Sequence, residues 1–249
     1  RFLGHSRNLH PEASLDSDRH RKTMIKANGI NHLPISTADT KTQIDFFTSV
    51  LGAELVALFP MHNVSGAHHT FLKLSDKCCL SFVEFPQNKD IEPIAGVTYT
   101  QMGASAPGTL QHVAFNVDSI EELLDMRDRL RSKGIHVFGP LDHGVMQSIY
   151  FNGPDHLSLE IATYTNSINP EAWIDPQIVE ALGISPEELA RYKAPDPYQG
   201  KGGTVPQPPV DPIKNHALFE DELLKQIIEM PDEEVFETMS TPNPPVELS

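Results

Sequence analysis

Apolar and polar residues alternate along several short stretches of this chain. Residues 111–117 read Gln-His-Val-Ala-Phe-Asn-Val, so the large apolar residues occupy every second position. A period of two places these residues on one face of a β-strand and the polar or small ones on the other. Residues 31–36 and 156–161 follow the same pattern. The alternation therefore predicts three half-buried strands.

The order of predicted elements occurs twice. Helical spacing of apolar residues predicts helices over 40–51 and 120–133, and each is followed by a glycine, Gly52 or Gly134, that is suited to end it. Alternation predicts the accompanying strands, which are 29–36, 53–59, 68–74 and 79–85 in the first half and 110–117, 135–138, 146–151 and 156–163 in the second. Equivalent residues lie about eighty positions apart. The sequence thus predicts a duplicated βαβββ unit.

Composition changes outside these two units and predicts the domain boundaries. Residues 87–107 are rich in Pro, Gly, Gln and Ser, as in a linker. Residues 165–249 are rich in proline and carry helical patterns at 174–182, from Pro186 onward and at 218–230. This extension favours a structural role, wrapping the body or a neighbouring subunit of a homo-oligomer. The predicted parts are an N-terminal arm (1–27), a first module (28–86), the linker, a second module (108–164) and the extension (165–249).

Three potential metal ligands lie on the polar faces of the strands predicted over 31–36, 111–117 and 156–161. They are His32, His112 and Glu160. A single histidine on a strand is most often a structural polar residue, but the equivalence of His32 and His112 across the repeat favours a shared role. Two imidazoles and one carboxylate leave coordination positions open, an arrangement that suits non-haem Fe(II). We therefore predict that these three residues hold a divalent metal.

Charge and hydropathy exclude some partners. The formal net charge of −15 argues against nucleic acid, which needs a basic surface. No run of about 18 apolar residues exists, so we expect no membrane span, and the first residues lack the apolar region of a signal peptide. The adjacent Cys78 and Cys79 favour reduced thiols. These features predict a cytoplasmic protein that binds neither nucleic acid nor a membrane.

The duplicated unit, with histidine on the first strand of each half and glutamate on the last strand, resembles the vicinal oxygen chelate superfamily. The resemblance covers residues 28–164, and its most specific segments are 29–32, 110–115 and 148–160. It implies an α+β fold in which two paired βαβββ modules form a cup-shaped mixed sheet around a metal, here with the N-terminal arm and the Pro-rich, partly helical extension added. The family turn Asp-Pro-Asp-Gly reads Gly-Pro-Asp-His at 153–156.

The resemblance also implies catalytic residues. His68 and His69 fall on opposite faces of one predicted strand, so only one of them can face the metal, and the likeness to extradiol dioxygenases favours His69 for acid/base chemistry. A tyrosine ten residues before the glutamate contacts substrate in those enzymes, which implies this role for Tyr150. His143 lies in a loop that carries a histidine in extradiol enzymes, at a different spacing, and an exposed loop histidine is the equal alternative.

The number of protein ligands separates the possible reactions. The superfamily offers a fourth ligand position on the strand 79–85, and alternation places Glu84 on the face away from the cup unless a bulge turns it inward. Three ligands favour an extradiol-type dioxygenase that cleaves a catechol-type aromatic substrate with O₂ at Fe(II). The alternatives are a glyoxalase-like lyase, isomerase or epimerase using Mn, Zn, Ni or Co, and a metal-free protein that sequesters a small molecule.

Overall fold

A computed structural model describes residues 26–61, 64–100, 103–198, 202–209, 226 and 228–247. The chain divides into two compact units, of which residues 28–184 form one. The other comprises Arg1–Ala27 and Ser185–Ser249. Both predicted modules belong to the first of these units.

The first module is a four-stranded mixed sheet with one helix. Its sheet order is β1-β4-β3-β2, with β1 parallel to β4 and the other pairs antiparallel. The π-helical turn η1 continues directly from α1, so the single helix predicted over 40–51 changes its geometry at Phe47. The elements are β1 (His32–Ser36), α1 (Thr40–Phe46), η1 (Phe47–Leu51), β2 (Glu54–Pro60), β3 (His68–Ser75) and β4 (Cys78–Glu84), and the short η2 (Asn88–Asp90) follows.

The second module repeats this topology. Its sheet order is β5-β8-β7-β6, again with one parallel pair, β5 and β8. The predicted fold class, two βαβββ modules of mixed sheet and helix, is therefore confirmed. The elements are β5 (Val113–Asn116), α2 (Ile120–Ser132), β6 (Phe138–Asp142), β7 (Met146–Asn152), η3 (Pro154–His156) and β8 (Ser158–Tyr164).

One predicted strand was wrong. Residues 135–137 are irregular, and the strand in this region is β6, which begins at Phe138 and contains Gly139 and Pro140. Glycine and proline are depleted in strands, so they hide the pattern, but an edge strand tolerates proline because its N–H groups need no partner on the open side. β6 is an edge of its sheet.

Local sequence explains where the two helices begin. Asp39 caps α1, because its side chain accepts a hydrogen bond from the backbone N–H of Thr42. Ser119 caps α2 by accepting from the backbone N–H of Glu122. The Glu122 side chain reaches back and accepts from the backbone N–H of Asp118. Both helices therefore start at the points that the sequence predicts.

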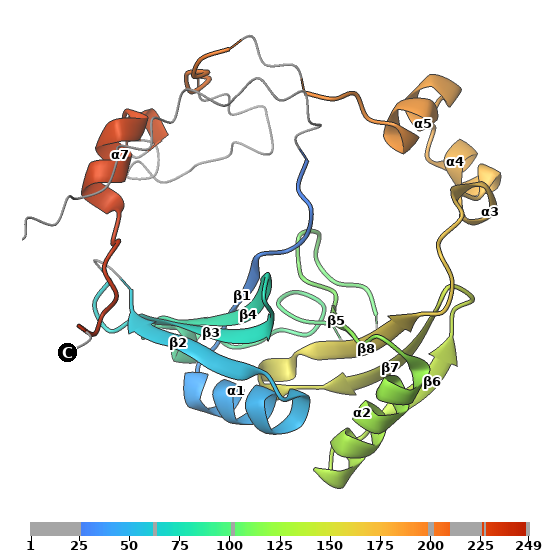
Figure 1. Ribbon diagram of the computed structural model, residues 1–249, viewed down its shortest axis with the longest axis horizontal. Coiled ribbons are helices and arrows are strands. Elements are labelled where there is room, and N and C mark those ends of the chain that lie inside the picture. Colours follow the sequence, from blue (N-terminus) through green and yellow to red (C-terminus); the bar gives the residue numbers. More distant parts are fainter. Residues whose placement is uncertain are drawn as a thin grey trace, which may run out of the picture. The chain divides into compact units, whose positions relative to one another are not determined.

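The two modules share one hydrophobic core. Figure 1 shows α1 and α2 along the lower side of the two sheets, and the rings of Phe47 and Phe115, one from each module, lie 6.2 Å apart. Because side chains alternate along a strand, the sheet faces that point away from this core carry the polar residues. The largest fully buried apolar residues in the described part of the chain are Phe47, Leu72, Leu80, Phe82, Leu123, Leu130, Ile149, Leu159 and Ile161.

A partly buried hydrogen-bond cluster also joins the modules. The hydroxyl of Thr37, directly after β1, donates to a carboxylate oxygen of Asp155 at 2.6 Å. The side-chain amide of Gln43, which is fully buried in α1, donates to the same oxygen at 2.8 Å. Asp155 lies in the turn before β8 and adopts a left-handed backbone conformation with φ of 53°. The cluster ties that turn to the first module.

The C-terminal extension contains short helices. Within the unit formed by residues 28–184 these are α3 (Pro170–Trp173) and α4 (Pro176–Ala181), and the latter matches the helix predicted over 174–182. In the other unit, α5 (Pro186–Lys193) begins at the predicted proline with a capping box, and α7 (Asp232–Met239) was not predicted. No helix among the described residues is long and apolar enough to span a membrane.

Parts of the terminal predictions cannot be compared with this structure. The arm (1–27) and the helix predicted over 218–230 lie mostly outside the described residues. The homo-oligomer and the cytoplasmic location stay predictions.

Candidate metal centre

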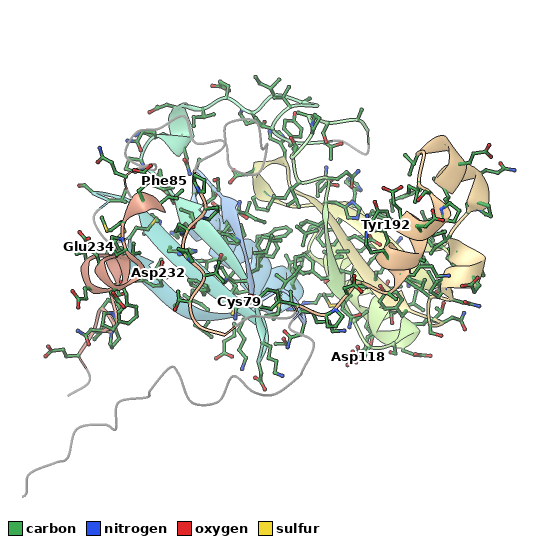
Figure 2. All side chains as sticks on the ribbon, turned by 90° about the horizontal axis from the view of Figure 1, so that it is seen from above. Cys79, Phe85, Asp118, Tyr192, Asp232 and Glu234 are labelled. Carbon is green, nitrogen blue, oxygen red and sulfur yellow. The ribbon has the colours of Figure 1, made fainter. Side chains whose placement is uncertain are left out.

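We call the face of each sheet that points away from the shared hydrophobic core its outward face. On the first sheet this face carries two of the predicted site residues. Strand register places His32 beside Cys79, which is labelled in Figure 2, and places His69 beside Val83. Because register partners share a face and alternate residues along a strand do too, His32 and His69 point to the same side. Their ring centroids are 6.4 Å apart. β1 and β3 therefore bring these two histidines together.

His32 is exposed, and its neighbour in the chain orients its ring. Nδ1 of His32 lies 2.8 Å from the side-chain oxygen of Asn31. An amide oxygen only accepts, so this contact is a hydrogen bond in the tautomer that carries the N–H on Nδ1, which leaves Nε2 to bind a metal. A neutral imidazole with a free Nε2 is the form that binds metals.

His69 is partly buried and sits among aromatic rings. Its Nε2 lies 3.4 Å from the hydroxyl of Ser81. The centroids of the His69 and Phe71 rings are 4.5 Å apart. Burial lowers the pKa of His69, and the nearby His32 lowers it further. The ring is therefore neutral at neutral pH and can accept a proton.

The second sheet brings the other two predicted ligands into contact. Nε2 of His112 lies 2.8 Å from a carboxylate oxygen of Glu160, whose residue is only 5% exposed. His112 directly precedes β5, and β5 pairs in parallel with β8 so that Ala114 lies beside Glu160. Nδ1 of His112 also contacts the side-chain oxygen of Gln111. An amide residue thus precedes the histidine in both modules, a repeat that the sequence prediction missed although it is visible in the sequence.

Tyr150 and His143 lie next to this pair. Tyr150 is the register partner of Glu160 in β7 and β8, and its ring centroid is 6.3 Å from that of His112. The hydroxyl of Tyr150 is 3.0 Å from Nε2 of His143. Burial raises the pKa of Tyr150, and the negative charge of Glu160 raises it further, so the phenol keeps its proton and can donate it in a hydrogen bond.

The structure thus forms two separate clusters from the predicted site residues. His32 and His69 belong to the first sheet, and His112, Glu160, Tyr150 and His143 to the second. Within the described part of the chain, no three His, Cys, Asp or Glu side chains gather closely enough to hold a metal ion. The imidazole nitrogen and carboxylate oxygen of His112 and Glu160 are suitable donor atoms for a divalent metal, and this pair is the best-formed part of the candidate site.

Glu84 lies away from both clusters. Its carboxylate accepts from the backbone N–H of Thr40 at 2.8 Å and lies 3.2 Å from Nε2 of His68. His68 and Glu84 are register partners, one position along from the pair His69 and Val83. Both therefore occupy the face that carries α1, as the alternation predicts.

The sequence assigns the chain to a family. The model of the Glyoxalase/Bleomycin resistance protein/Dioxygenase superfamily matches residues 29–161, and the chain belongs to this superfamily. Its members include the vicinal oxygen chelate dioxygenases and glyoxalases that the repeat resembles.

Two dioxygenases of Rhodococcus globerulus are similar in sequence. Biphenyl-2,3-diol 1,2-dioxygenase 2 is 26% identical over 191 residues, which cover 75% of this chain and 86% of that protein. Biphenyl-2,3-diol 1,2-dioxygenase 3 is 36% identical over 66 residues, which cover 26% of this chain and 34% of that protein. The first of these supports an enzyme related to dioxygenases, without identifying its substrate or metal.

Two solved structures illustrate the similarity at the level of structure. A glyoxylase/bleomycin resistance protein/dioxygenase domain from Frankia sp. EAN1pec shares 14% identity with a TM-score of 0.44, covering 56% of this chain and 99% of that one. The fosfomycin resistance protein FosX from Listeria monocytogenes, solved with Mn(II) and sulfate, shares 20% identity with a TM-score of 0.38, covering 56% and 95%.

Proposed function

We propose that this protein is a metal-dependent dioxygenase of the extradiol type, which cleaves a catechol-type aromatic ring with O₂. The observation that supports it best is the contact between His112 and the nearly buried Glu160, with the hydroxyl of Tyr150 beside them. The similarity to biphenyl-2,3-diol 1,2-dioxygenase 2 supports the same reaction class.

The proposed ligands are His112 and Glu160 with His32 as the third, and Fe(II) is the proposed metal. When bound, Fe(II) supplies positions at which a vicinal diol and O₂ can be brought together. Mn, Zn, Ni or Co also accept this combination of nitrogen and oxygen donors.

The other site residues handle protons and orientation. His69, neutral because its pKa is lowered, accepts a proton from a catechol hydroxyl. Tyr150 donates a hydrogen bond to a substrate oxygen, and His143 positions the Tyr150 hydroxyl through their 3.0 Å contact. Each role uses an atom that lies on the outward face of its sheet or in the loop beside it.

The position of Glu84 counts against a glyoxalase-like reaction. A lyase or isomerase of this kind needs a carboxylate base near the metal. Glu84 instead lies on the α1 side, bonded to Thr40 and His68. We therefore retain the three-ligand dioxygenase as the proposal.

Oxygen uptake tests the proposal. The protein is loaded anaerobically with Fe(II), mixed with a panel of catechols and then exposed to O₂. We expect O₂ consumption and a coloured ring-cleavage product, both lost in His112→Ala and retained in the control variant His68→Ala, because His68 contacts Thr40 and Glu84 on the α1 side. Tight metal binding without O₂ consumption would favour a lyase or isomerase, and no metal binding at all would favour a sequestering protein.

A further inference from the structure

A second feature lies at the end of the second sheet, beside Tyr150. There a cavity of about 880 Å³ opens where β7 ends and β8 begins, next to the C-terminal end of α2 and the segment leading into β6. Its lining residues are Arg131, Gly134, Ile135, His136, Val137, Phe138, Tyr150, Phe151, Asn152 and Ser158. Tyr150 is the one lining residue with a role in the proposed reaction, and the cavity is large enough for a drug-sized ligand.

The lining combines apolar walls with one permanent positive charge. Aliphatic and aromatic side chains make up much of the wall, including Phe138, which is 55% exposed and whose ring centroid is 6.4 Å from that of Tyr150. No lining residue is acidic, in a chain whose net charge is −15. Arg131 is the lining residue that is always charged. A ligand that fits this lining is apolar along its length and anionic at one end.

Arg131 is available to bind such an anion. The nearest acid along α2, Asp128, is already paired with Arg127, whose Nε lies 2.8 Å from its carboxylate. Among the residues that the structure describes, Arg131 takes part in no ion pair. The hydrogen bond from Arg127 lowers the pKa of Asp128, and the charge of Arg131 adds to this effect, but Arg131 forms no ion pair with that carboxylate. Its guanidinium can therefore bind an external carboxylate through two parallel hydrogen bonds.

Tyr150 connects the cavity to the candidate metal centre. It lines the cavity and is also the register partner of Glu160. Ser158 also lines the cavity, and it lies two residues before Glu160 on the same face of β8. Two residues of a strand span about 7 Å, which is the distance along β8 from Glu160 to the cavity lining at Ser158. If an aromatic ring binds beside Glu160, a substituent of that ring that extends past Tyr150 therefore reaches the cavity after a few bonds.

We propose that this cavity binds a substituent of the substrate, an apolar chain or ring that ends in a carboxylate held by Arg131. The inference rests on the proposed function and makes it more specific, because it names the substrate class as catechols with an acidic side chain. Arg131 then acts on substrate affinity, and the His112–Glu160 pair on the reaction.

Matched substrates test this role. A catechol with a butanoate side chain is compared with butylcatechol, which has the same chain length and no charge. In Arg131→Gln we expect KM for the butanoate compound to rise about tenfold to a hundredfold, the usual cost of losing a hydrogen bond to a charged group, with kcat unchanged. KM for butylcatechol stays the same. Lys133→Gln removes a positive charge just past the same helix end but outside the cavity lining, so it leaves both KM values unchanged.

Binding to the metal-free protein separates this inference from the proposed reaction. Phenylbutanoate carries the chain and the carboxylate without a diol, and its affinity is measured by calorimetry. We expect it to bind the wild type and the Lys133→Gln variant equally, and to bind Arg131→Gln at least tenfold more weakly. Equal affinity for the wild type and Arg131→Gln would overturn the inference. If phenylbutanoate binding depends on Arg131 but no catechol causes O₂ uptake, the proposed binding role of the cavity is supported and the proposed dioxygenase reaction is refuted.

A change in the apolar wall gives an independent check. Phe138→Ala removes an exposed ring, so the fold is expected to tolerate it. We expect this variant to lower the affinity for butylcatechol and for the butanoate compound by the same factor, because the side chains of both compounds contact the apolar wall. An effect on the charged compound alone would contradict the proposed orientation of the chain.

Discussion

Nε2 of His112, the residue directly before β5, lies 2.8 Å from a carboxylate oxygen of Glu160 in β8, although the two residues are far apart in the sequence. The contact exists because β5 pairs in parallel with β8, and this pairing places Ala114, two residues after His112, beside Glu160. A carboxylate that is 5% exposed is costly to keep charged without a positive partner. A bound metal ion would supply such a positive charge.

Replacing Glu160 tests the metal centre directly. In Glu160→Gln we expect the affinity for Fe(II) or Mn(II) to fall by more than about a hundredfold, the upper range for loss of an outer-sphere partner, because a ligand itself is lost. Chelator competition measures this affinity. Glu84→Gln is the matched control, since Glu84 also contacts a histidine but lies on the α1 side. Equal losses in both variants would mean that Glu160 is not a ligand.

His68 and His69 provide a comparison of two faces of one strand. His69→Ala is expected to lower kcat by about a hundredfold to ten-thousandfold, the usual contribution of a general base. His68→Ala is expected to leave kcat within a few fold, because His68 contacts Thr40 and Glu84 on the other face. Steady-state O₂ uptake measures both. A loss of kcat in His68→Ala alone would reverse the assignment.

The contact between Tyr150 and His143 predicts coupled effects. Tyr150→Phe removes the phenolic hydroxyl, and we expect kcat/KM to fall about tenfold, the worth of one hydrogen bond. His143→Ala is expected to cause a smaller loss in the wild type and none in Tyr150→Phe, since its partner is then absent. The double-mutant cycle in kcat/KM measures this coupling, and additive losses would show that His143 acts independently.

The cluster around Asp155 predicts a loss of stability. Asp155→Ala leaves the fully buried amide of Gln43 without its 2.8 Å partner, and we expect unfolding to become easier by about 1–3 kcal/mol. Urea denaturation measures the change. Asp155→Asn keeps an acceptor oxygen and tolerates the positive φ, so its loss is expected to be smaller. Equal destabilisation in both variants would point to the charge instead of the hydrogen bonds.

Two predictions from the sequence differ in outcome for a physical reason. The strand that holds Glu160 was predicted because large apolar residues alternate there, and β8 is central in its sheet, with one face on the core. The strand at 135–138 was misplaced because β6 is an edge strand containing Gly139 and Pro140, which follow no alternating pattern. The burial of β6 itself alternates, but Gly139 and Pro140 occupy positions where a large apolar or polar side chain would show that alternation in the sequence.

The sequence by itself determined the repeat, the helix starts, and the faces on which His32, His112, Glu84 and Glu160 lie, but for His68 and His69 it determined only that their faces are opposite. These features follow from local rules, namely side-chain alternation and capping, that need no knowledge of distant contacts. Only the tertiary structure decided which of these residues meet. It placed His112 against Glu160 through the β5–β8 pairing, tied the turn at Asp155 to Gln43, and brought Arg131 to the same cavity as Tyr150. Each of these contacts joins distant parts of the chain, and the packing of sheets and helices around one core sets such contacts.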